Sequence, residues 1–440
     1  MKKTVKYFFF LISIVVLTGC GTREFLGFEK KKIKLPGKRI AILKEENNEN
    51  IPILKSKIEV VLDESSTTSD WLQSNSSANH LSINHLSDSK LEVFKTLVSG
   101  KGETKNSKIL TQPVIYKNNI FFLDAKSNVI SFDLIEKRII WKKNISSEGE
   151  KNHDIGGGLA IYKDTLIINS PYRQIISLDI ESGEVIWVKD IESALRSSPT
   201  IYDNKLLSLT LGNKLYALNA ESGDLLWEHQ GLFNNTTLMS SPKVAIDENI
   251  VIVPYSNGDF FALNLNNGRE IWRNSFIDLE VKETTNTFTD IDAFPVIKRD
   301  MVFMTSAVGK LSAINKKTGN KFWTKDIFST QTPAVNGNNI FIINKNKELI
   351  CLNIIDGGVK WSLNIDEGLS DQYRYRWMAP ILINSKLIIV GGEKKLIIID
   401  PFNGSILSIK KMPSFPTTSP LVVGGKLYLM LKNGAVVSIE

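Results

Sequence analysis

Short apolar runs separated by turn residues follow one another along most of this chain, and the pattern repeats. One copy spans residues 199–227, with apolar runs at Thr200–Tyr202, Lys205–Leu209, Lys214–Leu218 and Asp224–Trp227. Loose alternation within short runs predicts antiparallel strands in a meander. The turn before the fourth run begins at Asn219, whose side chain can bond the backbone, and ends at Gly223, which can adopt a positive φ. Each copy therefore predicts four strands.

The repeat is anchored by an Asp or Asn placed eight residues before a fixed position, which holds Trp in six of seven copies. The pairs are Asp133/Trp141, Asp179/Trp187, Asn219/Trp227, Asn264/Trp272, Asn315/Trp323, Asn353/Trp361 and Asp400/Ser408. Gly stands four residues after the Asp or Asn in six copies, at Gly183, Gly223, Gly268, Gly319, Gly357 and Gly404. Four strands in roughly 44 residues is the size of a β-propeller blade. We expect each Trp to pack between neighbouring blades, with its N–H on a turn carbonyl, and to be structural rather than ligand-binding.

The number of blades follows from where the repeats start. Seven of the eight repeats open with Pro, which costs no ladder hydrogen bond at the first residue of a strand. The last opens at Pro420 and has room for three strands before Glu440. We predict that Lys90–Val98 supplies the missing strand, with Phe94 in the Trp position. The chain is thus expected to be an all-β, eight-bladed propeller over residues 71–440, with the ring closed by an N-terminal strand.

The N-terminus has the features of a targeting segment. Lys2, Lys3 and Lys6 precede the apolar run Tyr7–Leu17, which is too short for a permanent membrane helix. The run ends in Leu-Thr-Gly-Cys20, which resembles the lipobox of bacterial lipoproteins. That resemblance implies removal of residues 1–19 and acylation of Cys20, including palmitate. Gly21 in place of Asp then implies the periplasmic face of the outer membrane. The alternative is a plain signal peptide with an incidental Cys.

Residues 20–70 are rich in Asn, Glu, Lys and Ser, and predict a flexible spacer behind the lipid anchor. Within the spacer, Ile40–Leu43 and Ile58–Leu62 are apolar enough for short strands or docking segments. The second cysteine, Cys351, has no disulfide partner once Cys20 is lipidated, and is expected to be a small apolar core residue. The net charge of +7 is spread along 440 residues, so it does not indicate a nucleic-acid partner.

Propellers with a Trp in each blade resemble the quinoprotein family, which binds pyrroloquinoline quinone and oxidises alcohols or sugars. This chain has no adjacent Cys pair, no calcium loop and no haem-binding Cys-x-x-Cys-His. Its histidines, His80, His85, His153 and His229, are interpreted as surface or turn residues rather than metal ligands. We therefore expect no catalytic residue, no metal and no cofactor. A quinone-dependent dehydrogenase or quinone-binding sensor in the periplasm is the alternative.

The lipobox, spacer and eight repeats together resemble the BamB family, propeller lipoproteins of the outer-membrane β-barrel assembly (BAM) complex. Two N-terminal stretches, Lys34–Leu43 and Trp71 to His80, look like the signature of its alphaproteobacterial members. The resemblance implies a non-enzymatic scaffold. Its partners would be the POTRA domains of BamA, other BAM subunits and unfolded outer membrane proteins as clients.

Two sequence matches resemble the docking surface of that family. Leu195-Arg196 precedes Pro199, similar to a Leu-Arg element, and Asp290-Ile-Asp292 precedes Pro295, similar to an Asp-x-Asp element. Ser193 departs from the family pattern, in which a second Leu stands there. Independently of the resemblance, Arg196 and Asp292 each lie three residues before a blade-opening Pro, so their loops should share one rim. Partner contact is our hypothesis for Leu195, Arg196, Asp290 and Asp292; the alternative is local turn bonds or mutual pairing.

Overall fold

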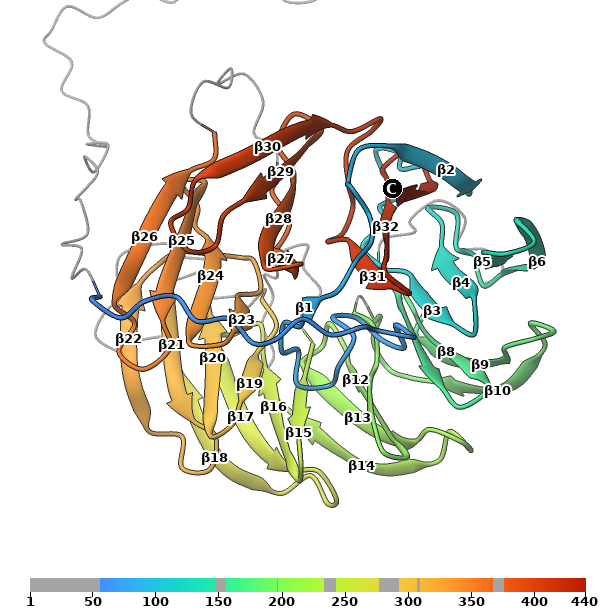
Figure 1. Cartoon of the computed structure of the whole chain (residues 1–440). Coiled ribbons are helices and arrows are strands. Elements are labelled where there is room, and N and C mark those ends of the chain that lie inside the picture. The colour runs from blue at the N-terminus through green and yellow to red at the C-terminus, as the bar shows by residue number, and fades with distance from the viewer. Residues whose placement is uncertain are drawn as a thin grey trace, which may run out of the picture. The chain divides into compact units, whose positions relative to one another are not determined.

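The computed structural model describes residues 56–146, 156–195, 197–232, 243–276, 293–306, 309–366 and 376–440. These residues form a ring of eight four-stranded antiparallel blades, which confirms the predicted propeller (Figure 1). The compact unit to which they belong begins at Ile53. Within these ranges, no helix has the length and apolar character needed to cross a membrane.

Strands run from the inside of the ring outward in each blade. Blades 1 to 4 comprise β3 (Val114–Tyr116), β4 (Asn119–Leu123), β5 (Asn128–Asp133) and β6 (Arg138–Asn144); β7 (Gly158–Tyr162), β8 (Thr165–Ser170), β9 (Gln174–Asp179) and β10 (Val185–Asp190); β11 (Thr200–Tyr202), β12 (Lys205–Leu209), β13 (Lys214–Asn219) and β14 (Leu225–Gln230); and β15 (Ala245–Asp247), β16 (Ile250–Pro254), β17 (Asp259–Asn264) and β18 (Glu270–Ser275). The strands predicted from residues 199–227 are confirmed as β11 to β14.

The remaining blades repeat this arrangement. They comprise β19 (Val296–Lys298), β20 (Met301–Thr305), β21 (Lys310–Asn315) and β22 (Lys321–Asp326); β23 (Ala334–Asn336), β24 (Asn339–Ile343), β25 (Glu348–Asn353) and β26 (Val359–Asn364); β27 (Ile381–Ile383), β28 (Lys386–Gly391), β29 (Lys395–Ile399) and β30 (Ile406–Lys411); and β31 (Leu421–Val423), β32 (Lys426–Met430), β33 (Ala435–Ile439) and β2 (Phe94–Ser99). A two-residue strand, β1 (Asn84–His85), runs parallel to β27.

Strand β2 closes the ring, as predicted, by pairing antiparallel with β33. Its register differs from the prediction by one residue. In the other blades, the Trp position lies opposite the residue two before the turn Asp or Asn, as Trp227 does opposite Ala217. The corresponding residue in blade 8 is Ser438, and Lys95 rather than Phe94 lies opposite it. Because a shift of one residue reverses the faces of a strand, Phe94 packs instead against the cluster between blades 7 and 8.

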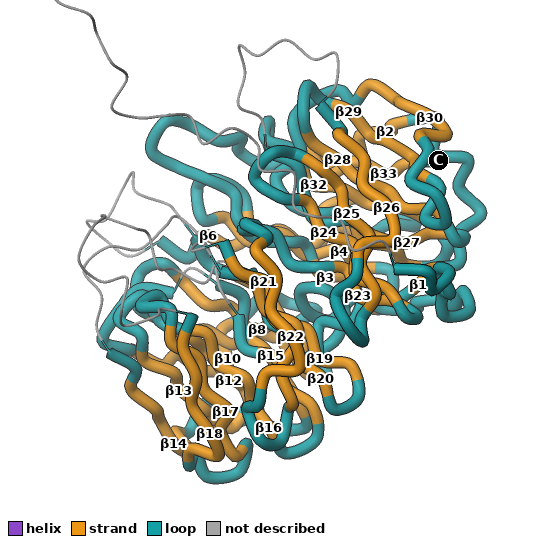
Figure 2. The backbone as a smooth tube through the Cα atoms, turned by 90° about the vertical axis from the view of Figure 1, so that its left-hand side faces the viewer, coloured by secondary structure: helices purple, strands orange, loops and turns teal. Residues whose placement is uncertain are grey.

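The hydrophobic core is divided among the blade junctions rather than gathered in one place. Each of the eight clusters of buried apolar residues combines side chains of two neighbouring blades. Cys351 belongs to the cluster between blades 6 and 7 and is fully buried, as expected of a small core residue. Because every cluster is shared by two blades, each blade depends on its neighbours for stability. Figure 2 shows the strands stacked side by side around the ring.

The tryptophans join each blade to the next, as predicted. Five indole N–H groups donate to the carbonyl after the turn Asp or Asn of the following blade: Trp141 to Ile180 (3.0 Å), Trp227 to Leu265 (2.9 Å), Trp272 to Lys316 (2.8 Å), Trp323 to Ile354 (3.0 Å) and Trp361 to Pro401 (2.8 Å). Trp187 is the exception, because its buried Nε1 has no hydrogen-bond partner. The repeat therefore encodes an inter-blade contact.

Trp and Gly are coupled at these junctions. A Cβ added to the turn Gly would lie 2.6–2.9 Å from the preceding blade's indole ring, for example 2.6 Å for Gly268 against Trp227. Both residues are missing together at the two remaining junctions. Blade 1 carries Lys137 in the Gly position, at a φ of 55°, and Lys95 stands in the Trp register of the blade before it. Blade 8 has no such turn, because its outer strand comes from the N-terminus, and Ser408 replaces Trp in blade 7.

Part of the predicted spacer is docked on the propeller. Val61 N–H donates to Asn338 Oδ1 at 2.9 Å, and Asp63 pairs with Lys298 at 2.9 Å. Thr68 accepts a hydrogen bond from Gly424 N–H at 2.8 Å. These contacts lie on the turns between first and second strands, the side we call the turn face, and the segment crosses in front of the blades in Figure 1. Residues 56–70 are thus not a free tether, whereas Ile40–Leu43 and Cys20 lie outside the described residues.

Candidate functional site: the central channel and its loop face

Residues 71–88, which we call the inner belt, run around the inside of the ring and contact all eight blades in chain order. The contacts with blades 1 to 8 are, in turn, Trp71 with Ile115, Leu72 with Ile161, Gln73 with Ile201, Ala78 with Ile246, Asn79 with Ile297, Ser82 with Asn336, Asn84 with Leu382, and Ser87 with Gly425. Most of these contacts are made with backbone groups on the inner edge of the first strand of each blade. The belt therefore satisfies edges that would otherwise line an open channel.

Two histidines of the belt are buried inside the channel, so their interpretation as surface or turn residues was wrong. The Nδ1–H of His80 donates to the Pro295 carbonyl at 2.9 Å, and His85 Nδ1 lies 3.0 Å from Thr68 Oγ1. Burial lowers the pKa of His80 to about 3 and that of His85 to about 4. Both imidazoles are therefore neutral at pH 7. No group of three His, Cys, Asp or Glu side chains that could hold a metal is present in the described residues.

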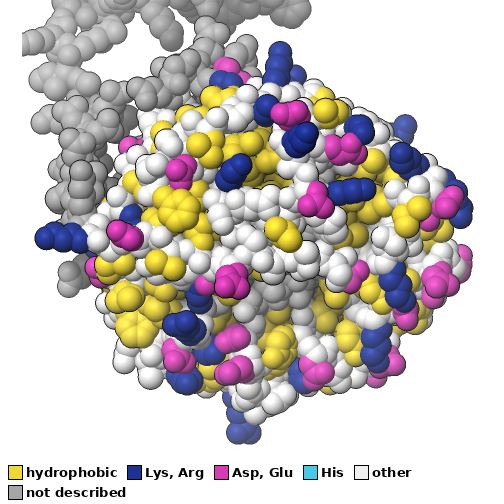
Figure 3. Space-filling model, in the orientation of Figure 1, with side chains coloured by type: hydrophobic (Ala, Val, Ile, Leu, Met, Phe, Trp, Pro, Cys, Tyr) yellow, Lys and Arg dark blue, Asp and Glu magenta, His cyan; other side chains and the backbone are white. Residues whose placement is uncertain are grey.

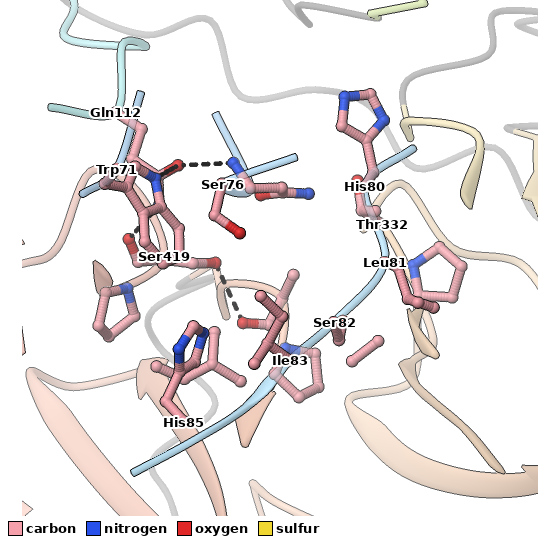
Figure 4. A pocket seen from close by; sticks show the side chains of 17 residues that line it. Trp71, Ser76, His80, Leu81, Ser82, Ile83, His85, Gln112, Thr332 and Ser419 are labelled. Atoms are coloured by element: carbon pink, nitrogen blue, oxygen red, sulfur yellow. Dashed lines mark hydrogen bonds between the residues drawn. The ribbon is translucent and has the colours of Figure 1, made fainter. Parts of the chain in front are cut away.

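Two small cavities lie along the channel in the part of the chain that the structure describes. One, of about 40 Å³, lies between Trp71, His80, His85 and the blade-opening prolines (Figure 4). The other, of about 120 Å³, lies beside it toward the loops that join successive blades, the side we call the loop face. Sites for drug-sized ligands and cofactors measure roughly 300–1,000 Å³. A pyrroloquinoline quinone does not fit either cavity unless the belt moves.

The predicted partner-binding residues fall in loops that lead into blades 3 and 5. Leu195 is fully buried in the cluster between blades 2 and 3, and its carbonyl accepts a hydrogen bond from Gly157 N–H at 3.2 Å. Its side chain has no surface with which to contact a partner, so we revise its role to that of a core residue. Arg196, Asp290 and Asp292 lie outside the described residues. Their described neighbours, Ser197 and Ala293, are both buried where the loops enter the blades.

The turn face differs from the channel in character. Figure 3 shows Lys, Arg, Asp and Glu side chains of both signs interspersed around the rim, with apolar side chains between them. The six repeat tryptophans lie at blade junctions and not in the channel. Sequence reasoning missed the belt, since residues 71–88 show no strand alternation. The one available signal was the clustering of Trp71, His80 and His85 ahead of the first repeat.

Comparison with known proteins identifies related chains. A family model described as "Outer membrane protein assembly factor BamB" matches residues 138–363, which is half of the chain. An uncharacterised protein of Rickettsia conorii is 31% identical over 267 residues, covering 60% of this chain and 64% of the relative, so the match spans less than two thirds of that protein. BamB of Escherichia coli K12 is 28% identical over 202 residues, covering 46% of this chain and 49% of the relative.

Solved structures agree on the fold. The crystal structure of BamB from Moraxella catarrhalis has a TM-score of 0.65 at 18% identity and covers 79% of this chain and 99% of that one. A europium-containing methanol dehydrogenase also has a TM-score of 0.65, at 11% identity, covering 82% and 89%. At such identities the structures show the propeller alone. The family model, with the Asp/Asn–Gly–Trp repeat that fills the matched region, shows that this chain belongs to the BamB family of outer membrane protein assembly factors.

Proposed function

We propose that this chain is a non-enzymatic scaffold subunit of the BAM complex, which assembles β-barrel proteins in the outer membrane. Its membership of the BamB family, matched over residues 138–363, carries the proposal. The inner belt supports it, because the belt runs along the channel and the two cavities described there, of about 40 and 120 Å³, are smaller than sites for cofactors. A rigid ring with loops gathered on one face suits a protein that binds other proteins.

We further propose that the POTRA domains of BamA bind the loop face, with Arg196, Asp290 and Asp292 supplying charged contacts. The described ends of both loops, Ser197 and Ala293, are buried against rigid blades, which would present the residues before them from fixed points. Other BAM subunits and unfolded outer membrane proteins are further candidate partners. Charged groups at such an interface chiefly set the association rate and the choice of partner.

The test is a binding assay between the full chain, purified in detergent, and the POTRA domains of BamA from the same organism. We expect Arg196→Ala and Asp292→Ala each to weaken binding at least tenfold, with an unchanged melting temperature. Matched controls are Arg269→Ala and Asp224→Ala, which alter exposed residues of the third-to-fourth-strand turns on the opposite face. Equal binding by all four variants would exclude the proposed contacts, and no binding by the wild-type chain would exclude the partner.

We also propose that Cys20 carries the lipid anchor that holds the chain at the periplasmic face of the outer membrane. The support is the Leu-Thr-Gly-Cys20 sequence at the end of the apolar run. Mass spectrometry of the purified chain should find an acylated N-terminal Cys20, and Cys20→Ser should leave the protein unprocessed. A chain cleaved elsewhere with a free thiol would contradict the lipobox.

The quinone-dependent enzyme remains the alternative to be tested, because methanol dehydrogenase shares the fold. A fluorescence titration of the full chain with pyrroloquinoline quinone distinguishes the two functions. We expect no saturable binding, since the two described channel cavities measure only about 40 and 120 Å³. Saturable quinone binding without POTRA binding would replace the scaffold proposal.

A further inference from the structure

Lys243 is a buried lysine without a carboxylate partner among the described residues. The residue is 6% exposed, and within the described residues no oxygen atom bonds Nζ, which lies 4.3 Å from the centre of the Phe294 ring. The other lysine buried among the described residues, Lys316, is 3% exposed and pairs with both Asp247 and Glu248. Burial lowers the pKa of Lys243 to about 7. An unpaired buried charge is costly, and a bound anion would offset that cost.

The surroundings of Lys243 are suited to an anion. Lys243 lines the cavity of about 120 Å³ at the loop-face end of the channel, together with Arg376, Phe294, Gln112 and Thr418. No Asp or Glu is among the described residues that line it. The hydroxyl of Thr418 is buried and has no hydrogen-bond partner in the described chain, so it is a second polar group without a partner at this cavity. Cavity, ammonium and hydroxyl are three observations that agree.

We propose that this cavity binds a carboxylate group, held by the Lys243 ammonium, with the Thr418 hydroxyl as a second donor. The Lys243 ammonium and the Thr418 hydroxyl are two donor groups at this cavity, which matches the two acceptor oxygens of a carboxylate. The volume admits a small group together with a few waters but not a cofactor. The carboxylate is supplied either by a free small acid or by an acidic side chain of a protein docked on the loop face, and the second source rests on the scaffold function proposed above.

Calorimetry with acetate tests the site. The full chain in detergent is titrated with acetate at constant ionic strength near pH 7.5, in two buffers of different ionisation enthalpy. Because a carboxylate raises the pKa of a neighbouring ammonium, acetate binding should take up protons. Lys243→Met should weaken acetate binding at least tenfold and abolish proton uptake, and Thr418→Val should weaken binding to a smaller degree. Lys411→Met, at an exposed lysine of β30, should change neither.

Three further outcomes decide the proposal. Equal acetate binding by wild type and Lys243→Met overturns it. Acetate binding that appears only in Asp292→Asn means that the chain's own carboxylate fills the site, and overturns an external ligand. Absence of acetate binding in both the wild type and Asp292→Asn also overturns it. When acetate does bind, competition between excess acetate and the POTRA domains supports the side-chain source, and independent binding supports a free acid. POTRA binding measured without acetate reports separately on the scaffold function.

Discussion

Replacing Gly268 by alanine tests why each turn has Gly at this position: because the tryptophan ring leaves no room for a Cβ, or because the backbone has a positive φ. Gly268 has a φ of +69°, and a Cβ there would lie 2.6 Å from Cε3 of Trp227. Lys137 occupies the same turn position in blade 1 at a φ of 55°, and its N–H bonds the Asp133 carbonyl as Gly268 N–H bonds that of Asn264. The positive φ is therefore tolerated by a side chain where no Trp docks.

The expected loss of stability has two parts. A positive φ costs an L-residue roughly 1–2 kcal/mol, and forcing an extra methyl into a packed contact costs about 1–3 kcal/mol. The matched control is Gly424→Ala, which has a φ of +57° and no atom within 4 Å of the added Cβ. We therefore expect a loss of about 1–2 kcal/mol for the control and roughly 2–5 kcal/mol for Gly268→Ala. For a domain of this size, each kcal/mol lowers the melting temperature by about 1 °C.

The assay is differential scanning calorimetry together with urea unfolding of both variants, with Trp227→Ala added to complete a double-mutant cycle. Trp227→Ala alone should cost about 3–5 kcal/mol. Because the clash disappears with the ring, the double variant should be more stable than the sum of the single changes predicts, by about 1–3 kcal/mol. Equal losses of stability for Gly268→Ala and Gly424→Ala, or strict additivity in the cycle, would refute the reasoning that the Trp227 ring excludes a Cβ at position 268.

The remaining predictions concern the other tryptophans and the N-terminal segment. Trp227→Phe should cost about 1 kcal/mol more than Trp187→Phe in urea unfolding, because only Trp227 Nε1 has a hydrogen bond to lose; equal losses would contradict this. The pKa values of His80 and His85 are lower in the folded than in the unfolded state, so below pH 6.5 the unfolded state binds more protons. The free energy of unfolding should therefore decrease as the pH is lowered, by about 2 kcal/mol for each imidazole at pH 5. Unfolding free energies at pH 7.5 and 5 test this, and a flat profile would show that the imidazoles are accessible. Gly337→Ala would place a Cβ 1.7 Å from the Val61 carbonyl, so limited proteolysis should cut residues 56–70 faster in this variant than in the wild type. In the control Gly424→Ala, where the added Cβ meets no atom within 4 Å, these residues should be cut more slowly than in Gly337→Ala.

The blade repeat was predictable because its causes are local. Strand alternation, the turn that begins at Asn219 and the opening prolines each depend on residues within one copy, so the eight blades and the role of the tryptophans could be derived from spacing alone. The pairing of Trp with Gly was visible as a pattern, but its reason needed the structure. Each Trp contacts the Gly of the following blade rather than that of its own, as Trp227 contacts Gly268, and the absence of a Cβ leaves room for the ring.

The candidate site was less predictable because it depends on contacts between distant parts of the chain. The resemblance to a Leu-Arg docking element implied partner contact for Leu195, yet packing between blades 2 and 3 buries this side chain. For Arg196, Asp290, Asp292 and Cys20, partner contact and lipidation remain predictions. The position of Lys243 could not be predicted from the sequence, because only the surrounding blades bury this residue beside a cavity.

The sequence by itself determined the architecture, the blade number and the inter-blade contacts, because a repeated local pattern with one buried face permits few arrangements. Tertiary structure alone decided the course of residues 56–88, the register of β2 and the filling of the channel. These segments have no repeat, and their partners lie hundreds of residues away, as Asn84 lies opposite Leu382. A non-local pairing of this kind depends on strand edges whose backbone groups have no hydrogen-bond partner within their own blade. These edges come together only once the ring has formed.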